Sequence, residues 1–149
     1  MKKIFHYLQP ELVVFLEAPS RDEVLKELVD LAYRNGKLQD KEAFYEAIIE
    51  REKIVSTGIG MGVAIPHAKL PSYDDFFIAV ACLKTGVDWN ALDGTLVRLI
   101  FMIGGPDDKQ TEYLQLLSGL TMAIKDEERR KKVLNSGSPQ EIIELFKGF

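Results

Sequence analysis

The sequence predicts an α/β fold: a mixed sheet of four or five strands with helices on both sides. The first observation is the order of segments, which is one strand, two helices, three strands and then helices. The second is the length of 149 residues, which suits one domain with a sizeable core. The third is the mixture of short branched or aromatic runs with longer amphipathic stretches. We therefore expect a single domain over residues 1–149.

The N-terminal part of the chain is expected to form one strand and two helices. Residues 12–16 are a continuous apolar run, which is typical of a short buried strand. Ser20 begins the first helix, with Glu23 completing a capping box, and Gly36 is suited to end it. Asp40 caps a second helix, which ends in a charged run just before a glycine-rich segment.

Three further strands are expected in the middle of the chain. Their runs are rich in branched and aromatic residues and cover residues 62–65, 76–83 and 96–103. Turn-forming residues fill the stretch 84–94 between the last two strands. The triplet Gly104-Gly105-Pro106 is expected to break the chain after the third strand.

The C-terminal part is expected to be helical. Leucines at helical spacing predict a helix over residues 111–125. The charged segment 126–134 predicts a further short helix with a solvated face. Ser138, followed by Pro139 and then by Glu141, predicts the start of a last helix, because these residues suit the cap, the first position and the third position.

Composition and charge exclude several classes of function. The chain is 46% apolar and 28% charged, as ordinary globular proteins are. Its net charge of −4 argues against a dedicated nucleic-acid binder. No apolar run approaches the roughly 20 residues needed to span a bilayer, and the N-terminus lacks the pattern of a signal peptide. We expect a cytoplasmic protein without direct membrane insertion.

Cysteine and histidine are scarce in this chain. Cys82 is the single cysteine and lies in an apolar run, so we expect a core residue in a reducing compartment. His6 and His67 are the two histidines, which leaves too few ligands for a zinc site or a metal-dependent hydrolase. We expect neither a metal nor a cofactor. His6 is expected to be an ordinary surface or strand residue.

The most informative segment is residues 56–68, which carries three glycines and places Pro66 directly before His67. Glycine lets another molecule approach closely, and successive free N–H groups can bind an anion. Arg51 precedes this segment, and its planar fork suits a phosphoryl group. A neutral imidazole held in one tautomer is a competent nucleophile toward phosphorus. These residues indicate reversible phosphorylation of His67. The alternative is that the glycines form a turn and a bulge, and that His67 ends a strand without chemistry.

Residues near the segment allow two interpretations each. Thr57 either donates a hydrogen bond to a phosphoryl group or forms a turn, and Ser56 offers a second hydroxyl. Arg51 contacts a phosphoryl group or a partner, or it ends a helix in solvent. Trp89 is expected to pack under the turn-rich stretch 84–94.

The run that begins at Arg51-Glu52 and continues through Ser-Thr-Gly-Ile-Gly-Met-Gly-Val-Ala-Ile-Pro-His-Ala-Lys-Leu resembles the enzyme IIA domains of the bacterial phosphoenolpyruvate-dependent phosphotransferase system. The similarity is greatest to the fructose/mannitol class, which includes the nitrogen-regulatory enzyme IIA proteins. The segments 86–94, 97–103 and 113–118 also look like this family, so the resemblance covers nearly the whole chain. Residues 1–149 are thereby identified as an enzyme IIA type-2 domain.

The resemblance implies roles for individual residues. His67 is expected to accept a phosphoryl group from the phosphohistidine of the carrier protein HPr or a paralogue, and Arg51 matches the family's active-site arginine. The family's second active-site histidine falls at Tyr113. This departure keeps a hydrogen-bond donor but loses a positive charge. Tyr113 is therefore either an active-site group or a packed aromatic residue with a satisfied hydroxyl.

The resemblance leaves three hypotheses about function. In sugar-transport members the phosphoryl group passes to a cysteine of an enzyme IIB domain, whereas in nitrogen-type members the phosphorylation state is itself the signal. The ending Pro-His-Ala-Lys-Leu looks more like the nitrogen-regulatory type, so we expect a free-standing regulatory enzyme IIA. A sugar-specific member of the fructose/mannitol type is the first alternative. The second is a regulatory binding module in which Tyr113 impairs phosphotransfer.

Overall fold

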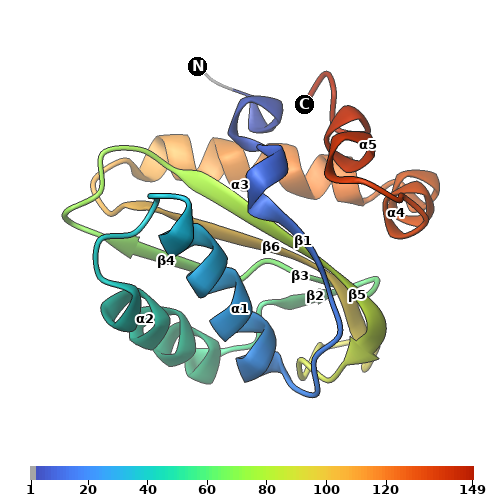
Figure 1. Ribbon diagram of the computed structural model, residues 1–149, viewed down its shortest axis with the longest axis horizontal. Coiled ribbons are helices and arrows are strands. Elements are labelled where there is room, and N and C mark those ends of the chain that lie inside the picture. Colours follow the sequence, from blue (N-terminus) through green and yellow to red (C-terminus); the bar gives the residue numbers. More distant parts are fainter. Residues whose placement is uncertain (1–2) are drawn as a thin grey trace.

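The computed structural model describes residues 3–149, and its elements form a sheet with helices packed on both faces (Figure 1). The helical elements are η1 (Ile4–Tyr7), η2 (Pro10–Leu12), α1 (Arg21–Arg34), α2 (Lys41–Ile54), α3 (Gln110–Ile124), α4 (Glu127–Leu134) and α5 (Pro139–Glu144), of which η1 and η2 are 3-10 helices. The strands are β1 (Val13–Leu16), β2 (Gly58–Gly60), β3 (Val63–Ala64), β4 (His67–Leu70), β5 (Phe77–Val87) and β6 (Val97–Pro106). The predicted α/β class is confirmed.

The sheet is mixed and is built around β6. Its strand order is β1-β5-β6-β3-β2, and β4 pairs with β6 beyond the end of β3. β5 and β6 are antiparallel, whereas β1 runs parallel to β5, and both β3 and β4 run parallel to β6. The sheet has six strands where four or five were expected, because the glycine-rich part of the chain forms β2, β3 and β4 rather than one strand.

The alternation of side chains along β5 separates two cores. Ile78 and Val80 belong to the core beneath α3, α4 and α5, whereas Ala79 and Ala81 belong to the core beneath α1 and α2. Figure 1 shows these two groups of helices on opposite sides of the sheet. Because both faces are covered, β5 and β6 consist of nearly continuous apolar residues.

The predicted helix starts are confirmed by side-chain caps. Ser20, Asp40 and Ser138 each accept a hydrogen bond from the backbone N–H three residues further on. Such caps satisfy N–H groups that the first helical turn leaves without a partner. Gly36 follows the end of α1 with a φ of 75°, which glycine adopts without steric cost.

The helix α4 is solvated as expected along most of its length, but two of its arginines turn inward. Arg129 Nη1 donates to the Ala123 carbonyl at 2.8 Å, and Arg130 Nη1 donates to the Ile124 carbonyl at 2.7 Å. These carbonyls belong to the last turn of α3 and have no partner within that helix. The two arginines therefore cap α3, and their positive charges interact favourably with the negative end of its dipole.

The strands β5 and β6 both run further than predicted, and the expected break at Gly104-Gly105-Pro106 is wrong. These three residues belong to β6 and pair with β4. A Cβ atom on Gly104 would lie 2.3 Å from the ring of Phe77, and one on Gly105 would lie 2.2 Å from the ring of Phe76. The glycines therefore serve close packing of aromatic rings and do not form a turn.

The strand expected over residues 62–65 is shorter than predicted, and His67 begins a strand instead of ending one. Pro66 interrupts the ladder between β3 and β4, since it has no N–H to donate. Its carbonyl still accepts from the Ile103 N–H at 2.9 Å, which keeps the chain against β6. The chain then rejoins the sheet at His67, which pairs with Ile103.

Candidate functional site

The imidazole of His67 is held in one orientation by the backbone just before it. Its Nδ1 atom lies 3.2 Å from the carbonyl oxygen of Ile65. A carbonyl oxygen can only accept a hydrogen bond, so Nδ1 carries the proton when the ring is neutral. Nε2 is then left with a free lone pair.

The surroundings of His67 keep this ring neutral. Burial lowers the pKa of His67, and the nearby cations of Arg51 and Lys69 lower it as well, while the Ile65 carbonyl and the Glu52 carboxylate act in the opposite direction. Since the ordinary pKa of histidine is about 6.5, the lowered pKa leaves His67 neutral at pH 7. A neutral ring is the form that can act as a nucleophile.

An aromatic ring and an ammonium group from two different elements lie beside His67. The ring of Tyr113, on α3, has its centroid 5.5 Å from that of His67. The Nζ atom of Lys69, on β4, lies 4.2 Å from the centroid of the Tyr113 ring and 2.7 Å from the side-chain oxygen of Gln110. Burial raises the pKa of the Tyr113 phenol, although Arg51 opposes this effect. Tyr113 is thus a neutral donor at pH 7.

The guanidinium of Arg51 is placed by the end of α2. Its Nη1 atom donates to the Val55 carbonyl at 2.9 Å, which fixes the side chain against the turn that leaves the helix. The charge of Arg51 lowers the pKa values of both His67 and Tyr113, so all three side chains share one environment. We call His67, Arg51, Lys69 and Tyr113 the His67 site.

A buried carboxylate supports the segment that leads to the His67 site. Glu52 is 4% exposed and accepts the Thr57 N–H at 3.1 Å, the Thr57 hydroxyl and the Trp89 Nε1–H at 3.2 Å. Trp89 Nε1 also lies 3.2 Å from the Thr57 hydroxyl oxygen. A buried charge is tolerated when it is hydrogen-bonded in this way. The Thr57 hydroxyl therefore donates its hydrogen bond to Glu52, and the residue is only 5% exposed.

The amides of the glycine segment have partners within the protein. The N–H groups of Gly58, Met61 and Gly62 donate to the side chains of Ser56, Asp93 and Thr95. The expectation that successive free N–H groups would bind an anion is thus wrong for these amides. Of the three, the Met61 N–H meets a negative charge, the carboxylate of Asp93, whose pKa is lowered mainly by hydrogen bonds from Thr95 and also by this N–H.

The other residues that the sequence singled out lie outside the His67 site. Ser56 donates its hydroxyl to the Trp89 carbonyl and forms a turn. Trp89 is 1% exposed and belongs to the core beneath α1 and α2. Cys82 is buried, as expected, and burial raises the pKa of its thiol to about 12. His6 is an exposed residue of η1 and not part of a strand.

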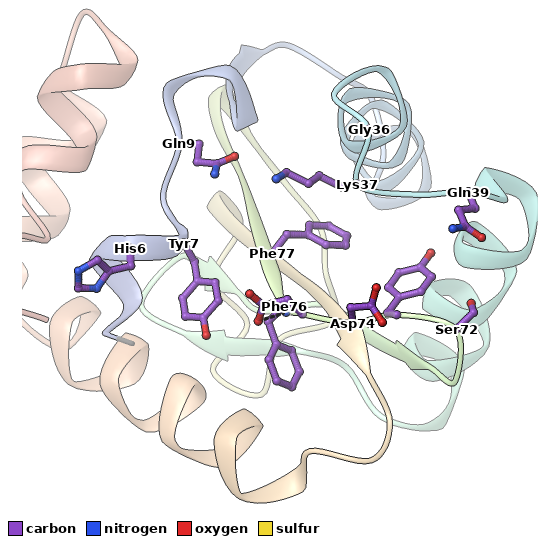
Figure 2. Close-up of a pocket in the computed structure, with 12 residues that line it drawn as sticks. His6, Tyr7, Gln9, Gly36, Lys37, Gln39, Ser72, Asp74, Phe76 and Phe77 are labelled. Carbon is purple, nitrogen blue, oxygen red and sulfur yellow. Dashed lines mark hydrogen bonds between the residues drawn. The ribbon is translucent and has the colours of Figure 1, made fainter. Parts of the chain in front are cut away.

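A separate cavity of about 300 Å³ lies between η1, the connection from α1 to α2 and the connection from β4 to β5 (Figure 2). Gln9 and Lys37 point toward one another across it, whereas His6 points away. His67 does not line this cavity. Phe76, one of its lining residues, also lies 6.2 Å from the ring of Tyr113, so the cavity and the His67 site share only a wall.

Sequence reasoning assigned no role to two residues that the structure brings to this region, Glu52 and Lys69. Lys69 is two residues beyond His67 on a strand, so a strand assignment over residues 67–70 would have placed both on one face. Glu52 follows Arg51 directly, and only its burial reveals that it supports Thr57 and Trp89.

Two further observations bear on function. Among residues 3–149, no group of three or more histidine, cysteine, aspartate or glutamate side chains is arranged to hold a metal ion. Within the same residues, no helix has both the length and the apolar character needed to cross a membrane.

The fold and the site define a class of protein: a mixed α/β sheet that presents a neutral, cation-flanked imidazole suited to carrying a group on nitrogen. The chain belongs to the family described as "Phosphoenolpyruvate-dependent sugar phosphotransferase system, EIIA 2", whose model matches residues 6–148. Members of this family are the protein-histidine phosphotransfer components of that system. The resemblance to enzyme IIA is thereby confirmed.

Similar proteins fall into a sugar-transport group and a regulatory group. The chain is 35% identical to a fructose-specific EIIA component of Haloferax volcanii, over 91% of this chain and 89% of that protein. It is 40% identical to the fructose-specific EIIABC component of Bacillus subtilis over 88% of this chain, but it spans only 21% of that protein's length.

Solved structures repeat this division. The nitrogen regulatory protein IIA-Ntr of Neisseria meningitidis superposes with a TM-score of 0.90 and 28% identity, covering 97% of this chain and 99% of that one. The mannitol enzyme IIA of Escherichia coli, solved in complex with its phosphorylated enzyme IIB, has a TM-score of 0.81, with coverage of 95% and 98%. Its identity of 20% supports a shared fold alone.

Proposed function

We propose that this chain is a phosphoryl relay that accepts a phosphoryl group on Nε2 of His67 from the phosphohistidine of HPr or a paralogue. The observation that carries the proposal is the contact of Nδ1 with the Ile65 carbonyl, because it leaves Nε2 of a neutral ring free to attack. Membership of the EIIA family supplies the phosphoryl chemistry. The reaction needs no cofactor in this protein.

The proposed step is an in-line transfer between two imidazole rings. The lone pair of His67 Nε2 forms a new N–P bond while the N–P bond of the donor breaks, and that electron pair returns to the donor nitrogen. The proton on Nδ1 stays at the Ile65 carbonyl throughout. Arg51 stabilises the charge on the equatorial oxygens, as preorganised cations do in phosphoryl transfer. Tyr113 donates a hydrogen bond.

Thr57 contributes indirectly in this proposal. Its hydroxyl and its N–H both bind Glu52, so Thr57 positions the turn between α2 and β2 and does not donate to the phosphoryl group. Of the two interpretations of Thr57, a donor to the phosphoryl group or a turn former, its burial fits the second. The interpretation of Thr57 as a turn former is the one that these contacts favour.

We propose that the phosphorylation state of His67 is a regulatory signal, as in nitrogen-regulatory enzyme IIA proteins. The near-complete mutual coverage of IIA-Ntr of Neisseria meningitidis, together with the ending Pro-His-Ala-Lys-Leu, supports this type. Delivery to the cysteine of an enzyme IIB in sugar transport is the second candidate, favoured by the higher identity to the fructose-specific relatives. Transfer of labelled phosphate from this protein to a fructose-type enzyme IIB separates the two.

The test of the relay is an intact-mass measurement after incubation with phosphoenolpyruvate, enzyme I and HPr. Wild type is expected to gain the mass of one phosphoryl group, which acid removes, because a phosphoryl group on nitrogen is labile. His67→Ala is expected to gain nothing, and His6→Ala is the matched control that should label like wild type. Labelling of His67→Ala would contradict the proposal.

A binding module with impaired phosphotransfer is the remaining candidate, and the observation behind it is the neutral Tyr113 beside His67. This candidate predicts that wild type takes no phosphoryl group from HPr while a control enzyme IIA in the same mixture does. Labelling of wild type at a rate like that of the control would exclude it.

A further inference from the structure

We propose that Lys69 is a second phosphoryl-binding cation of the His67 site, held in place by Tyr113 and Gln110. This inference rests on the proposed function and adds a residue to it. The observation behind it is that one ammonium group meets an aromatic face and an amide oxygen next to the nucleophile. The substrate that this ammonium group would contact is the phosphoryl group in transit.

The position of Lys69 follows from strand geometry. Residues 67 and 69 of β4 point to the same face, because side chains alternate along a strand. Two residues along a strand span about 7 Å, which the lysine stem can cover. Ala68 between them is buried in the opposite core, beneath α1 and α2. The ammonium group of Lys69 and Nε2 of His67 can therefore serve the same ligand.

Two contacts with α3 hold the lysine side chain. Nζ lies 4.2 Å from the centre of the Tyr113 ring, which is a cation–π distance, and 2.7 Å from the Gln110 oxygen. An ammonium group has three N–H donors, and Gln110 takes one of them. The others remain for phosphoryl oxygens. Tyr113 thus acts as a platform that fixes a positive charge without carrying one.

The charges around His67 support this assignment. Arg51 and Lys69 come from α2 and β4, and both act electrostatically on His67. Glu52 is the carboxylate that opposes them, and it is already bound by the donors of Thr57 and Trp89. In the unphosphorylated protein the two cations raise the positive potential at Nε2. A phosphoryl group, with a charge of about −1.5 to −2 at pH 7, would be neutralised in part by both cations.

In the transfer step, Lys69 gives up no proton and forms no covalent bond. The N–P bond of the donor breaks as the bond to His67 Nε2 forms, and the donor nitrogen keeps the electron pair. Lys69 donates hydrogen bonds to oxygens of the phosphoryl group in transit. These hydrogen bonds become stronger in the transition state, where charge is spread over the oxygens. Its effect is therefore expected on the rate of the step itself, more than on docking of the donor protein.

The experiment is single-turnover phosphorylation of the full chain at saturating phospho-HPr, and separately with phosphoramidate. Phosphoramidate is a small donor with a P–N bond whose leaving group is ammonia, so it needs no docking surface. The variants are Lys69→Met, Lys69→Gln and Lys69→Arg, with Lys26→Met as the matched control because Lys26 is exposed on α1. Thermal unfolding checks that each variant is folded.

We expect Lys69→Met and Lys69→Gln to lower the limiting rate roughly ten- to hundredfold with both donors. This is the change in rate that corresponds to the loss of one hydrogen bond to a charged group. Lys69→Arg should recover most of the rate, and Lys26→Met should match wild type. Removal of this cation should also raise the pKa of His67 in an NMR titration.

Two outcomes overturn the role of Lys69. The first is a limiting rate of Lys69→Met equal to that of Lys26→Met. The second is a loss seen only at subsaturating phospho-HPr and absent with phosphoramidate, which would make Lys69 a docking residue. Failure of wild type to label from phospho-HPr would instead overturn the proposed relay. The phosphoramidate arm then still decides whether Lys69 assists phosphorylation of His67.

Discussion

The residue on which the proposed chemistry depends is His67, and its properties come from short-range contacts. The Ile65 carbonyl selects the tautomer, and burial together with Arg51 and Lys69 disfavours the charged ring. A histidine at the surface would be partly protonated near pH 6.5. The environment of His67 therefore keeps the nucleophile available at lower pH than an exposed imidazole would allow.

This environment predicts that the stability of the fold depends on pH through His67. The pKa of His67 is lower in the folded state than in the unfolded state, so the unfolded chain binds more protons between the two values. The free energy of unfolding should therefore rise with pH up to about 6.5 through His67 and gain nothing from it above that. The measurement is urea unfolding of wild type and His67→Gln from about pH 5 to about pH 8, a range that brackets the ordinary histidine pKa of about 6.5.

The control for that measurement is His6→Gln, which removes an exposed imidazole. As pH rises toward about 6.5, we expect the free energy of unfolding of wild type to increase relative to that of His67→Gln. A difference that stays constant with pH would contradict the assigned environment of His67.

At the scale of elements, β6 and the strands on either side of it bring distant residues together. β4 and β5 both pair with the last residues of β6, and the two glycines there make room for the rings of Phe76 and Phe77. Phe76 in turn contacts Tyr113 of α3, at 6.2 Å between ring centres. Gly105 therefore makes room for the ring that lies beside Tyr113, whereas Gly104 makes room for Phe77 in the core on the opposite face.

Replacement of Gly105 tests this connection. In Gly105→Ala the new Cβ would lie 2.2 Å from Cδ1 of Phe76, so the buried ring has to move. Overpacking of this kind costs about 1–3 kcal/mol, and we expect Tm to fall by roughly 2–4 °C for each kcal/mol. Calorimetry provides the measurement. Gly137→Ala is the control, because nothing lies within 4 Å of a Cβ there. An equal Tm for the two variants would show that Phe76 adapts freely.

At the scale of the whole molecule, the chain forms two cores on either side of one sheet, and the C-terminal helices close one of them. Phe146 is fully buried in the core beneath α3, α4 and α5 and meets Phe101 of β6 edge to face, with 5.6 Å between ring centres. The Phe5 N–H donates to the Phe149 carbonyl at 3.0 Å, which joins the two ends of the described chain. The C-terminal segment is thus part of the core.

Removal of the Phe146 ring is expected to destabilise the entire domain. Phe146→Ala should lower the free energy of unfolding by about 3–5 kcal/mol, because the ring is fully buried and leaves a cavity against Phe101. Urea unfolding measures the loss, and Met122→Ala, at a side chain that is 64% exposed on α3, should change it by no more than about 0.5 kcal/mol. Similar values for the two variants would contradict this account of the core.

The sequence by itself determined the α-helices and the α/β class, and it singled out His67 as the candidate nucleophile, whereas the 3-10 helices η1 and η2 were not predicted. Helix starts depend on caps such as Ser20 and Asp40, whose partners are only three residues away, so local sequence is sufficient to find them. His67 was found because the proline and glycines around it are unusual in any local context. The family resemblance, which the comparisons confirm, rests on the same contiguous run of residues.

Only the tertiary structure decided where β6 ends and what surrounds His67. Gly104 and Gly105 look like a chain break in sequence, and they belong to a strand because β4 and two aromatic rings pack against them. Lys69 meets Tyr113 across 44 positions of sequence, and Trp89 meets Glu52 across 37. Contacts between residues so far apart depend on how strands pair and helices pack, and no local pattern of residues encodes them.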